Sequence, residues 1–185
     1  TVSGIENKIY NGRAHTQRSL VVKAGTKTLR LNKDYTVTYS KNKAVGKASV
    51  IIRGKNAYSG KITKTFTIVK AAKGKTYTVG KFKYTITGAK ADGTGTVAIS
   101  GTTYTRSDKK FASLTISDAV VIGGVKFKIT SVGANAFSRY SMLTSVVIGN
   151  NVTSIGSNAF VSCKNLKKVT IKSTKLKGVG AKAFS

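Results

Sequence analysis

The clearest pattern of hydrophobic and polar positions is a repeat in the last third of the chain. Phe137, Phe160 and Phe184 lie 23 and 24 residues apart, and each ends a G-x-x-A-F segment. The segment L-x-x-V-x-I occurs at residues 143–148 and again at 166–171. Its last three residues alternate apolar and polar positions, as a half-buried strand does. Each repeat therefore predicts one short strand and one turn.

A period in the twenties with one short strand in each unit is typical of leucine-rich-repeat solenoids. One such unit cannot bury its apolar side alone, so matching Leu, Val, Ile and Phe side chains are expected to stack between successive units. Glycine recurs at the same place in every unit, at Gly133, Gly156 and Gly180. This recurrence indicates either a special backbone angle or a close approach that a Cβ atom would prevent.

The residue before Ala-Phe is asparagine in two repeats, at Asn135 and Asn158, and Lys182 in the third. A short amide there is expected to hydrogen-bond turn groups that have no ladder partner. The third repeat stops at Ser185, before any strand. We expect an uncapped strand edge and apolar face at this end, covered by further chain or by another molecule, with weak self-association through it as salt rises.

Residues 5–68 show short alternating runs separated by turn residues such as Asn11-Gly12 and Ser59-Gly60. The strands predicted here span residues 20–22, 35–39, 48–52 and 64–68. Several short strands with frequent turns predict a β-sandwich.

Residues 71–74 are the expected linker between two domains, 1–71 and 75–185. Further strands are predicted at residues 76–79, 82–87, 96–99, 113–116 and 125–129, and Gly123-Gly124 predicts a hairpin. These strands are expected to form a β cap and a degenerate first coil, because the terminal repeats of solenoids are atypical. The clear repeats span residues 129–185.

The segment V-T-S-I-G-x-N-A-F-x-x-C-x-x-L-x-x-V-x-I at residues 152–171 resembles the BspA-type leucine-rich repeat of bacterial surface proteins. Segments at 34–39, 45–50 and 54–60 resemble a bacterial Ig-like surface module that often precedes such repeats. The chain departs from both patterns because it contains no proline. The resemblance implies a mainly β chain, with an N-terminal Ig-like β-sandwich followed by a short leucine-rich-repeat solenoid that has a β N-terminal cap.

Charge is the most unusual feature of the composition. The chain has 33 Lys and Arg residues against 5 acidic residues, a formal net charge of +28. Such a field attracts polyanions through sequence-independent electrostatics, although a merely solvated surface is the alternative. The candidate polyanion contacts are Lys164, Lys167, Lys168, Lys172, Lys175 and Lys177.

Groups that usually carry catalysis are scarce. The five acids are scattered, His15 is the only histidine and Cys163 the only cysteine, so paired carboxylates, a Cys-His nucleophile and a zinc site are not expected. Cys163 occupies the place that Tyr140 holds one repeat earlier, and we expect it to be a small buried filler. The sequence predicts no catalytic residues, no metal and no cofactor.

The expected function is therefore that of a non-catalytic, secreted or cell-wall-associated bacterial adhesion module. The resemblance implies ligands such as a host extracellular-matrix protein, mucin or anionic glycan, or a cell-wall polymer, and no specific nucleic acid is expected. No membrane span is expected, because no window approaches eighteen consecutive apolar residues. Two alternatives stay open. The chain could be the accessory targeting region of a larger surface enzyme, or a wall-associated polyanion binder in which charge matters more than the repeats.

Overall fold

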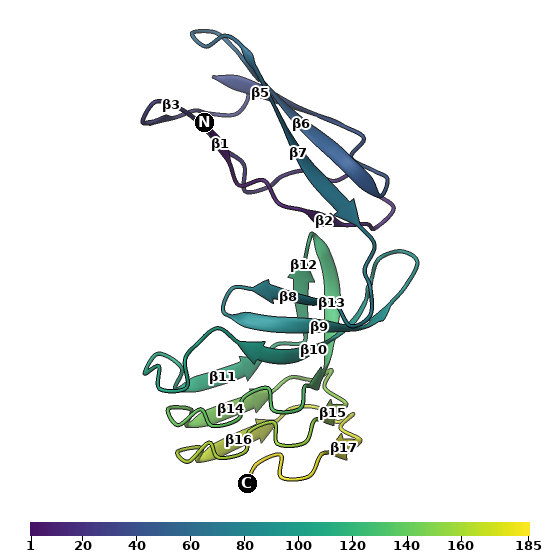
Figure 1. Ribbon diagram of the computed structural model, residues 1–185, viewed down its shortest axis with the longest axis vertical. Helices are drawn as coiled ribbons and strands as arrows, with labels where there is room; N and C mark the ends of the chain where they lie inside the picture. The colour runs from purple at the N-terminus through teal and green to yellow at the C-terminus, as the bar shows by residue number, and fades with distance from the viewer. The chain divides into compact units, whose positions relative to one another are not determined.

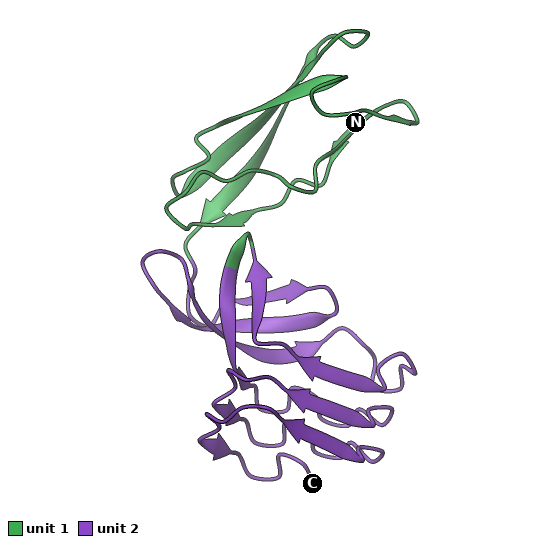
Figure 2. Cartoon of the chain, turned by 180° about the vertical axis from the view of Figure 1, so that it is seen from behind, with its two compact units in different colours: residues 1–70, 123–125 green, residues 71–122, 126–185 purple.

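The computed structural model describes residues 1–185 and contains seventeen strands and no helix (Figure 1). The expectation of a mainly β chain is confirmed. The chain divides into two compact units, one of residues 1–70 with 123–125 and one of residues 71–122 with 126–185 (Figure 2). No helix of a length and apolar character that could cross a membrane is present.

The first unit is built from two sheets. Its strands are β1 (Val2–Ser3), β2 (Lys8–Ile9), β3 (Val21–Ala24), β4 (Lys27–Thr28), β5 (Tyr35–Ser40), β6 (Gly46–Gly54) and β7 (Lys61–Val69). One sheet has the order β2-β7-β6-β5, and the other has the order β1-β3-β4. Strands β5, β6 and β7 pair antiparallel, whereas β2 joins the edge of β7 in parallel. The three long strands contain the runs that alternation predicted at residues 35–39, 48–52 and 64–68.

Alternation along the central strand β6 explains how the two sheets of the first unit pack. Ala48, Val50 and Ile52 are buried, and the residues between them are more exposed. Val50 and Ile52 form one cluster with Tyr35 from β5 and Val22 from β3. Because these side chains come from both sheets, a single apolar cluster holds the sheets together.

The remaining strands begin with an antiparallel meander. They are β8 (Thr76–Val79), β9 (Phe82–Ala89), β10 (Gly95–Thr102), β11 (Ser113–Ile116), β12 (Ala119–Ile122), β13 (Val125–Val132), β14 (Ser145–Ile148), β15 (Ser154–Ile155), β16 (Lys168–Ile171) and β17 (Gly178–Val179). Strands β8, β9 and β10 pair antiparallel, and β10 then pairs in parallel with β13. Strand β12 pairs with β13 across Gly123-Gly124, where the sequence predicts a hairpin.

Two ladders of parallel strands follow. Strands β11, β14 and β16 form one sheet, and β13, β15 and β17 continue the other. Val146 pairs with Val169, and Val132 with Ile155, so both ladders have the period of the repeat. The sequence missed the second ladder, and its expectation that the third repeat stops before any strand is wrong, since β17 lies in that repeat. Strands of two residues are too short to show an alternating pattern.

The phenylalanines of the repeats form a continuous stack. The ring centroids of Phe137 and Phe160 are 5.4 Å apart, and those of Phe160 and Phe184 are 5.2 Å apart, with interplanar angles of 12° and 5°. Phe160 is 1% exposed, whereas Phe184 at the end of the stack is 38% exposed. The predicted stacking of Phe160 between its two counterparts is confirmed.

The recurring glycines permit close approach between successive repeats. A Cβ atom at Gly156 would lie 2.5 Å from the backbone nitrogen of Ala134, and one at Gly180 would lie closer still to that of Ser157. Neither glycine has a positive φ. Of the two explanations that the sequence left open, close approach is the one observed at these two positions.

The residue before Ala-Phe has a left-handed backbone in every repeat. Asn135 and Asn158 both have a φ of 57°, and Lys182 has a φ of 52°. The sequence predicted an amide hydrogen bond as the reason for asparagine, but the structure shows a backbone reason instead. Asparagine adopts this conformation more readily than other residues with a Cβ, and lysine does so at a cost.

Lys182→Asn is expected to raise the free energy of unfolding by about 1 kcal/mol, because asparagine lowers the cost of a left-handed φ. Urea denaturation measures the difference. Lys175→Asn is the matched control, since it removes the same charge at a residue outside the left-handed region. Equal changes in both variants would show that charge, and not backbone conformation, is responsible.

Candidate functional site

The lysines that the sequence proposed as polyanion contacts lie around the last repeats without forming one cluster. They are Lys164, Lys167, Lys168, Lys172, Lys175 and Lys177. Lys164 and Lys167 line a concavity of about 340 Å³ beside Phe184. Lys172 and Lys175 instead act on the carboxylate of Asp118. Lys168 on β16 and Lys177 before β17 belong to neither group.

Asp118 has a structural role at the end of the strand ladder. Its carboxylate accepts hydrogen bonds from the backbone nitrogen of Asn150 at 2.7 Å and from the Asn150 amide at 3.1 Å. These bonds, followed by the charges of Lys172 and Lys175, lower the pKa of Asp118 below its ordinary value of 3.8. The carboxylate therefore stays ionised and ties the turn after β14 to the residues that follow β11.

The other four acids also have local partners. Glu6 pairs with Lys8 at 3.4 Å, Asp34 accepts from the Arg30 backbone nitrogen at 2.8 Å, Asp92 from that of Thr94 at 2.9 Å and Asp108 from that of Lys110 at 3.0 Å. No group of three or more His, Cys, Asp or Glu side chains is placed to hold a metal ion. The acids are used to shape turns and to balance nearby cations.

Cys163 is a buried structural residue. Its thiol donates a hydrogen bond to the carbonyl oxygen of Phe137 at 3.0 Å, and burial raises the pKa of the thiol. A buried, protonated thiol is a poor nucleophile, since the thiolate is the reactive form. The prediction that Cys163 fills space in the core is confirmed.

His15 is also buried, and its Nε2 atom has no hydrogen-bond partner. Its backbone is held by Asn42, which accepts from the His15 nitrogen at 2.8 Å and donates its amide to the His15 oxygen at 2.7 Å. Burial, and then the charge of Lys8, lower the pKa of His15 below 6.5. The folded first unit therefore favours a neutral imidazole.

The stability of the first unit should depend on pH through His15. Because the folded pKa lies below the unfolded value of 6.5, this contribution is present above pH 6.5 and is lost as pH falls through the folded pKa. Urea midpoints measured between about pH 7 and pH 5 should fall for the native chain and stay level for His15→Gln. Parallel pH profiles for the two proteins would contradict this assignment.

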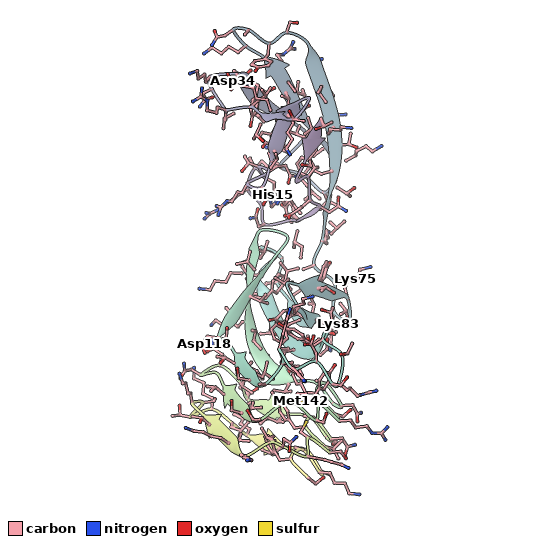
Figure 3. All side chains as sticks on the ribbon, turned by 90° about the vertical axis from the view of Figure 1, so that its left-hand side faces the viewer. His15, Asp34, Lys75, Lys83, Asp118 and Met142 are labelled. Atoms are coloured by element: carbon pink, nitrogen blue, oxygen red, sulfur yellow. The ribbon has the colours of Figure 1, made fainter.

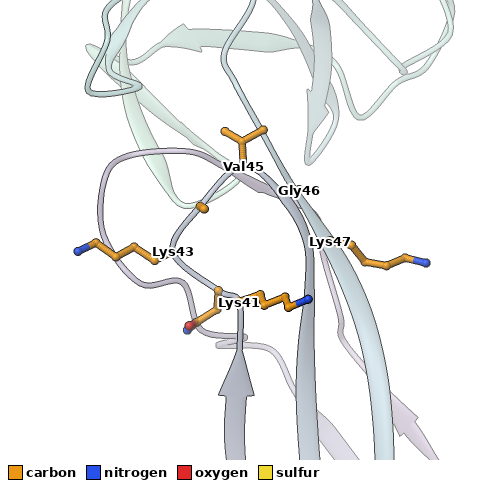
Figure 4. A pocket seen from close by; sticks show the side chains of 7 residues that line it. Lys41, Lys43, Val45, Gly46 and Lys47 are labelled. Carbon is orange, nitrogen blue, oxygen red and sulfur yellow. The ribbon is translucent and has the colours of Figure 1, made fainter.

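The loop between β5 and β6 forms a basic concavity of about 630 Å³ lined by residues 41–47 (Figure 4). Three lysines lie on it, at Lys41, Lys43 and Lys47. Figure 4 shows the Lys43 and Lys47 side chains extending away from the loop on opposite sides. Their charges diverge, so the loop does not place these two lysines around one ligand.

A second basic concavity, of about 510 Å³, lies beside β13 and is called the β13 pocket here. It is lined by Lys90, Thr94, Gly95, Thr96, Lys126 and Lys128. Phe127 and Ile129 point into the core, so Lys126 and Lys128 share the opposite face of the strand. Lys128 is in register with Thr96 on the neighbouring β10. The sequence reasoning missed this site, although the alternation in Val125-Lys-Phe-Lys-Ile129 indicated that the two lysines share a face.

Hydroxyl groups continue from the β13 pocket across the same face of the sheet. The hydroxyl oxygens of Thr87 and Thr96 lie 2.9 Å apart. Those of Thr85 and Ser100 are also 2.9 Å apart, and those of Thr76 and Thr85 are 2.8 Å apart. Strands β8, β9 and β10 therefore present a surface of small polar groups next to the lysines of β13.

Comparison with known proteins identifies the repeat region. Residues 96–185 match the family model described as the BspA type leucine rich repeat region. The resemblance to these repeats that the sequence showed from residue 129 is confirmed, and the match begins earlier, at residue 96. No curated protein matches the chain.

Two solved structures are similar to the chain. One is a leucine rich cell surface protein from Faecalibacterium prausnitzii A2-165, with 33% identity over 60% of this chain, 27% of that chain and a TM-score of 0.49. The other is a leucine-rich repeat protein from Bacteroides capillosus ATCC 29799, with 26% identity over 60% of this chain, 74% of that chain and a TM-score of 0.48. The chain thus spans about a quarter of the length of the first.

Proposed function

We propose that the chain is a non-catalytic binding module of a bacterial cell surface that holds acidic polymers. The observation that carries this proposal is the imbalance between cations and carboxylates. Among 33 Lys and Arg residues, Lys8 and Arg30 are the two that pair with a carboxylate. The remaining cations form no salt bridge with a carboxylate, so most of the positive charge is left to attract an anionic partner.

The match to BspA-type repeats supports a short solenoid in the second unit. The resemblance of the chain to that family implies a bacterial surface location. In this proposal the first unit is an Ig-like sandwich, and the second unit carries the solenoid that binds. Solenoids offer extended surfaces because each repeat adds the same side-chain positions next to those of its neighbour. A long, repetitive surface suits a polymer better than a compact ligand.

The chemistry of the side chains supports binding over catalysis. The acids shape turns, the thiol of Cys163 is buried and protonated, and the imidazole of His15 is buried. Lysine dominates the cations, and its ammonium group is a point charge that accepts anions of varied geometry. The module thus has the means to attract polyanions and lacks an assembled set of reacting groups.

Binding to an array of heparin, sialylated mucin, teichoic acid and matrix proteins, read at two salt concentrations, tests this function. We expect binding to the acidic polymers that falls steeply as salt rises, because each contact releases counterions. Neutral dextran is the control and should not bind. Failure to bind any acidic polymer at low salt, or binding that does not respond to salt, would refute the proposal.

A further inference from the structure

We infer that the β13 pocket is a specific site for a sulfate or phosphate ester group on an anionic polysaccharide. This inference rests on the proposed function and adds a location and a chemical class to it. The groups that carry the site are Lys90, Lys126, Lys128 and Thr96, whose hydroxyl lies beside that of Thr87, a residue outside the pocket lining. Each lies in the second unit of the chain.

Backbone pairing brings the three lysines to one concavity. Lys126 and Lys128 are two residues apart on β13, which separates their starting points by about 7 Å on the same face. Lys90 begins the turn between β9 and β10, where its backbone nitrogen donates to the Thr94 oxygen at 2.8 Å. The flexible stems of the lysines let their ammonium groups reach one anionic group from both sides of the pocket.

The hydroxyl pair supplies a neutral donor. The oxygens of Thr87 and Thr96 lie 2.9 Å apart, so one hydroxyl donates its hydrogen to the other. When Thr87 donates to Thr96, the single hydrogen of the Thr96 hydroxyl stays available for an anionic oxygen in the pocket. Thr94 does not serve this purpose, because its hydroxyl donates to Asp92 at 2.7 Å.

Asp92 is the carboxylate of the adjoining turn, and it leaves the pocket positive. Its carboxylate accepts hydrogen bonds from the hydroxyl and the backbone nitrogen of Thr94. These bonds, and then the charge of Lys90, lower the pKa of Asp92. Asp92 does not line the pocket, whose three charged side chains are all lysines. Lys83 and Thr85 share one face of β9, because they are two residues apart on the strand. In Figure 3, Asp118 lies on the opposite side of the unit from Lys83.

The composition of the site favours an ester oxyanion. A tetrahedral sulfate or phosphate concentrates its charge in a compact group, and lysine, the cation that lines the pocket, binds such groups as a point charge. The hydroxyl surface formed by Thr76, Thr85 and Ser100 continues the site with groups that can hydrogen-bond sugar hydroxyls. No aromatic side chain lines the pocket, so the stacking that single-stranded nucleic acids use is missing.

The test compares two variants of the full chain that lose the same charge. Lys90→Gln, Lys126→Gln and Lys128→Gln are combined in the pocket variant. Lys33→Gln, Lys64→Gln and Lys109→Gln, at three exposed lysines that line none of the concavities, are combined in the control variant. Calorimetric titration at constant salt uses heparin as the sulfated probe and yeast phosphomannan as the phosphorylated one. The pocket variant should bind on the order of a hundredfold more weakly, since a lysine near an anionic surface contributes roughly a factor of five. The control should stay within about fivefold of the native chain.

The hydroxyl pair is tested separately. Thr87→Val with Thr96→Val keeps every charge, so a loss of affinity for heparin or phosphomannan, with no loss for the carboxylate polymer hyaluronan, would support the ester site. Urea midpoints of all variants verify folding. Whichever ester probe shows the pocket-dependent loss identifies the ester that the site accepts.

Several outcomes would overturn the inference. Equal weakening of the pocket and control variants would show that only total charge matters, and the proposed function would stand. The same pocket-dependent loss with single-stranded DNA or hyaluronan would refute the selectivity for esters. If the native chain binds none of these polymers at low salt, the proposed function itself is wrong.

Discussion

Phe160→Ala is expected to lower the free energy of unfolding by about 3–5 kcal/mol, the range for deleting a buried aromatic ring. Phe160 is almost fully buried, and its ring stacks on Phe137 at 5.4 Å and on Phe184 at 5.2 Å. Removing it leaves a cavity between repeats and also breaks both aromatic contacts. Urea denaturation followed by circular dichroism measures the loss.

Phe184→Ala is the matched control for this substitution, because it deletes the same ring at the partly exposed end of the stack. Its effect should be clearly smaller, because folding buries less of the Phe184 ring and its removal leaves no enclosed cavity. A loss at Phe184 that equals or exceeds the loss at Phe160 would mean that burial within the stack does not determine stability here.

Gly156→Ala is expected to destabilise the second unit by about 3 kcal/mol, the upper end of the range for over-packing. The new Cβ atom would lie 2.5 Å from the Ala134 nitrogen and 2.8 Å from the Ala134 Cα and the Gly133 carbonyl carbon. All of these are backbone atoms, so the two repeats must move apart to accept the methyl group. The lost contacts between repeats then add to the strain.

Gly178→Ala separates this effect from the general cost of replacing glycine. A Cβ atom at Gly178 meets nothing within 4 Å, and its φ is not positive. Its replacement should be nearly neutral or slightly stabilising, because alanine restricts the unfolded chain. Thermal unfolding of both variants decides the matter. Similar losses at the two glycines would contradict the close-approach explanation.

The two basic concavities differ in a way that bears on function. The loop of residues 41–47 lets two of its lysines diverge, whereas the β13 pocket combines three lysines with a hydroxyl pair held by sheet pairing. A rigid sheet fixes the spacing of its side chains better than a loop does. High net charge explains general attraction to acidic polymers, and this local geometry is the basis for selecting among them.

The sequence by itself determined the repeat and much of the secondary structure. Stacking requires matching side chains at matching positions, so the periodic Phe137, Phe160 and Phe184 revealed their own contacts. Alternation likewise located β6 and β14, because a strand with one buried face must alternate. The same reasoning identified Cys163 as a core residue, since its counterpart in the preceding repeat is an aromatic side chain.

Only the tertiary structure decided what the sequence pattern does not encode. The two-residue strands β15 and β17 are too short to show periodicity. The sequence explained Asn158 by a hydrogen bond of its amide, whereas the structure shows a left-handed backbone there. Of the six lysines chosen for their closeness in sequence, Lys164 and Lys167 line one concavity, whereas Lys90 and Lys128 lie far apart in sequence and line another. The physical reason is that β10 pairs in parallel with β13 across a long connection. The register of such a pair depends on the packing of whole sheets, and no local run of residues specifies it.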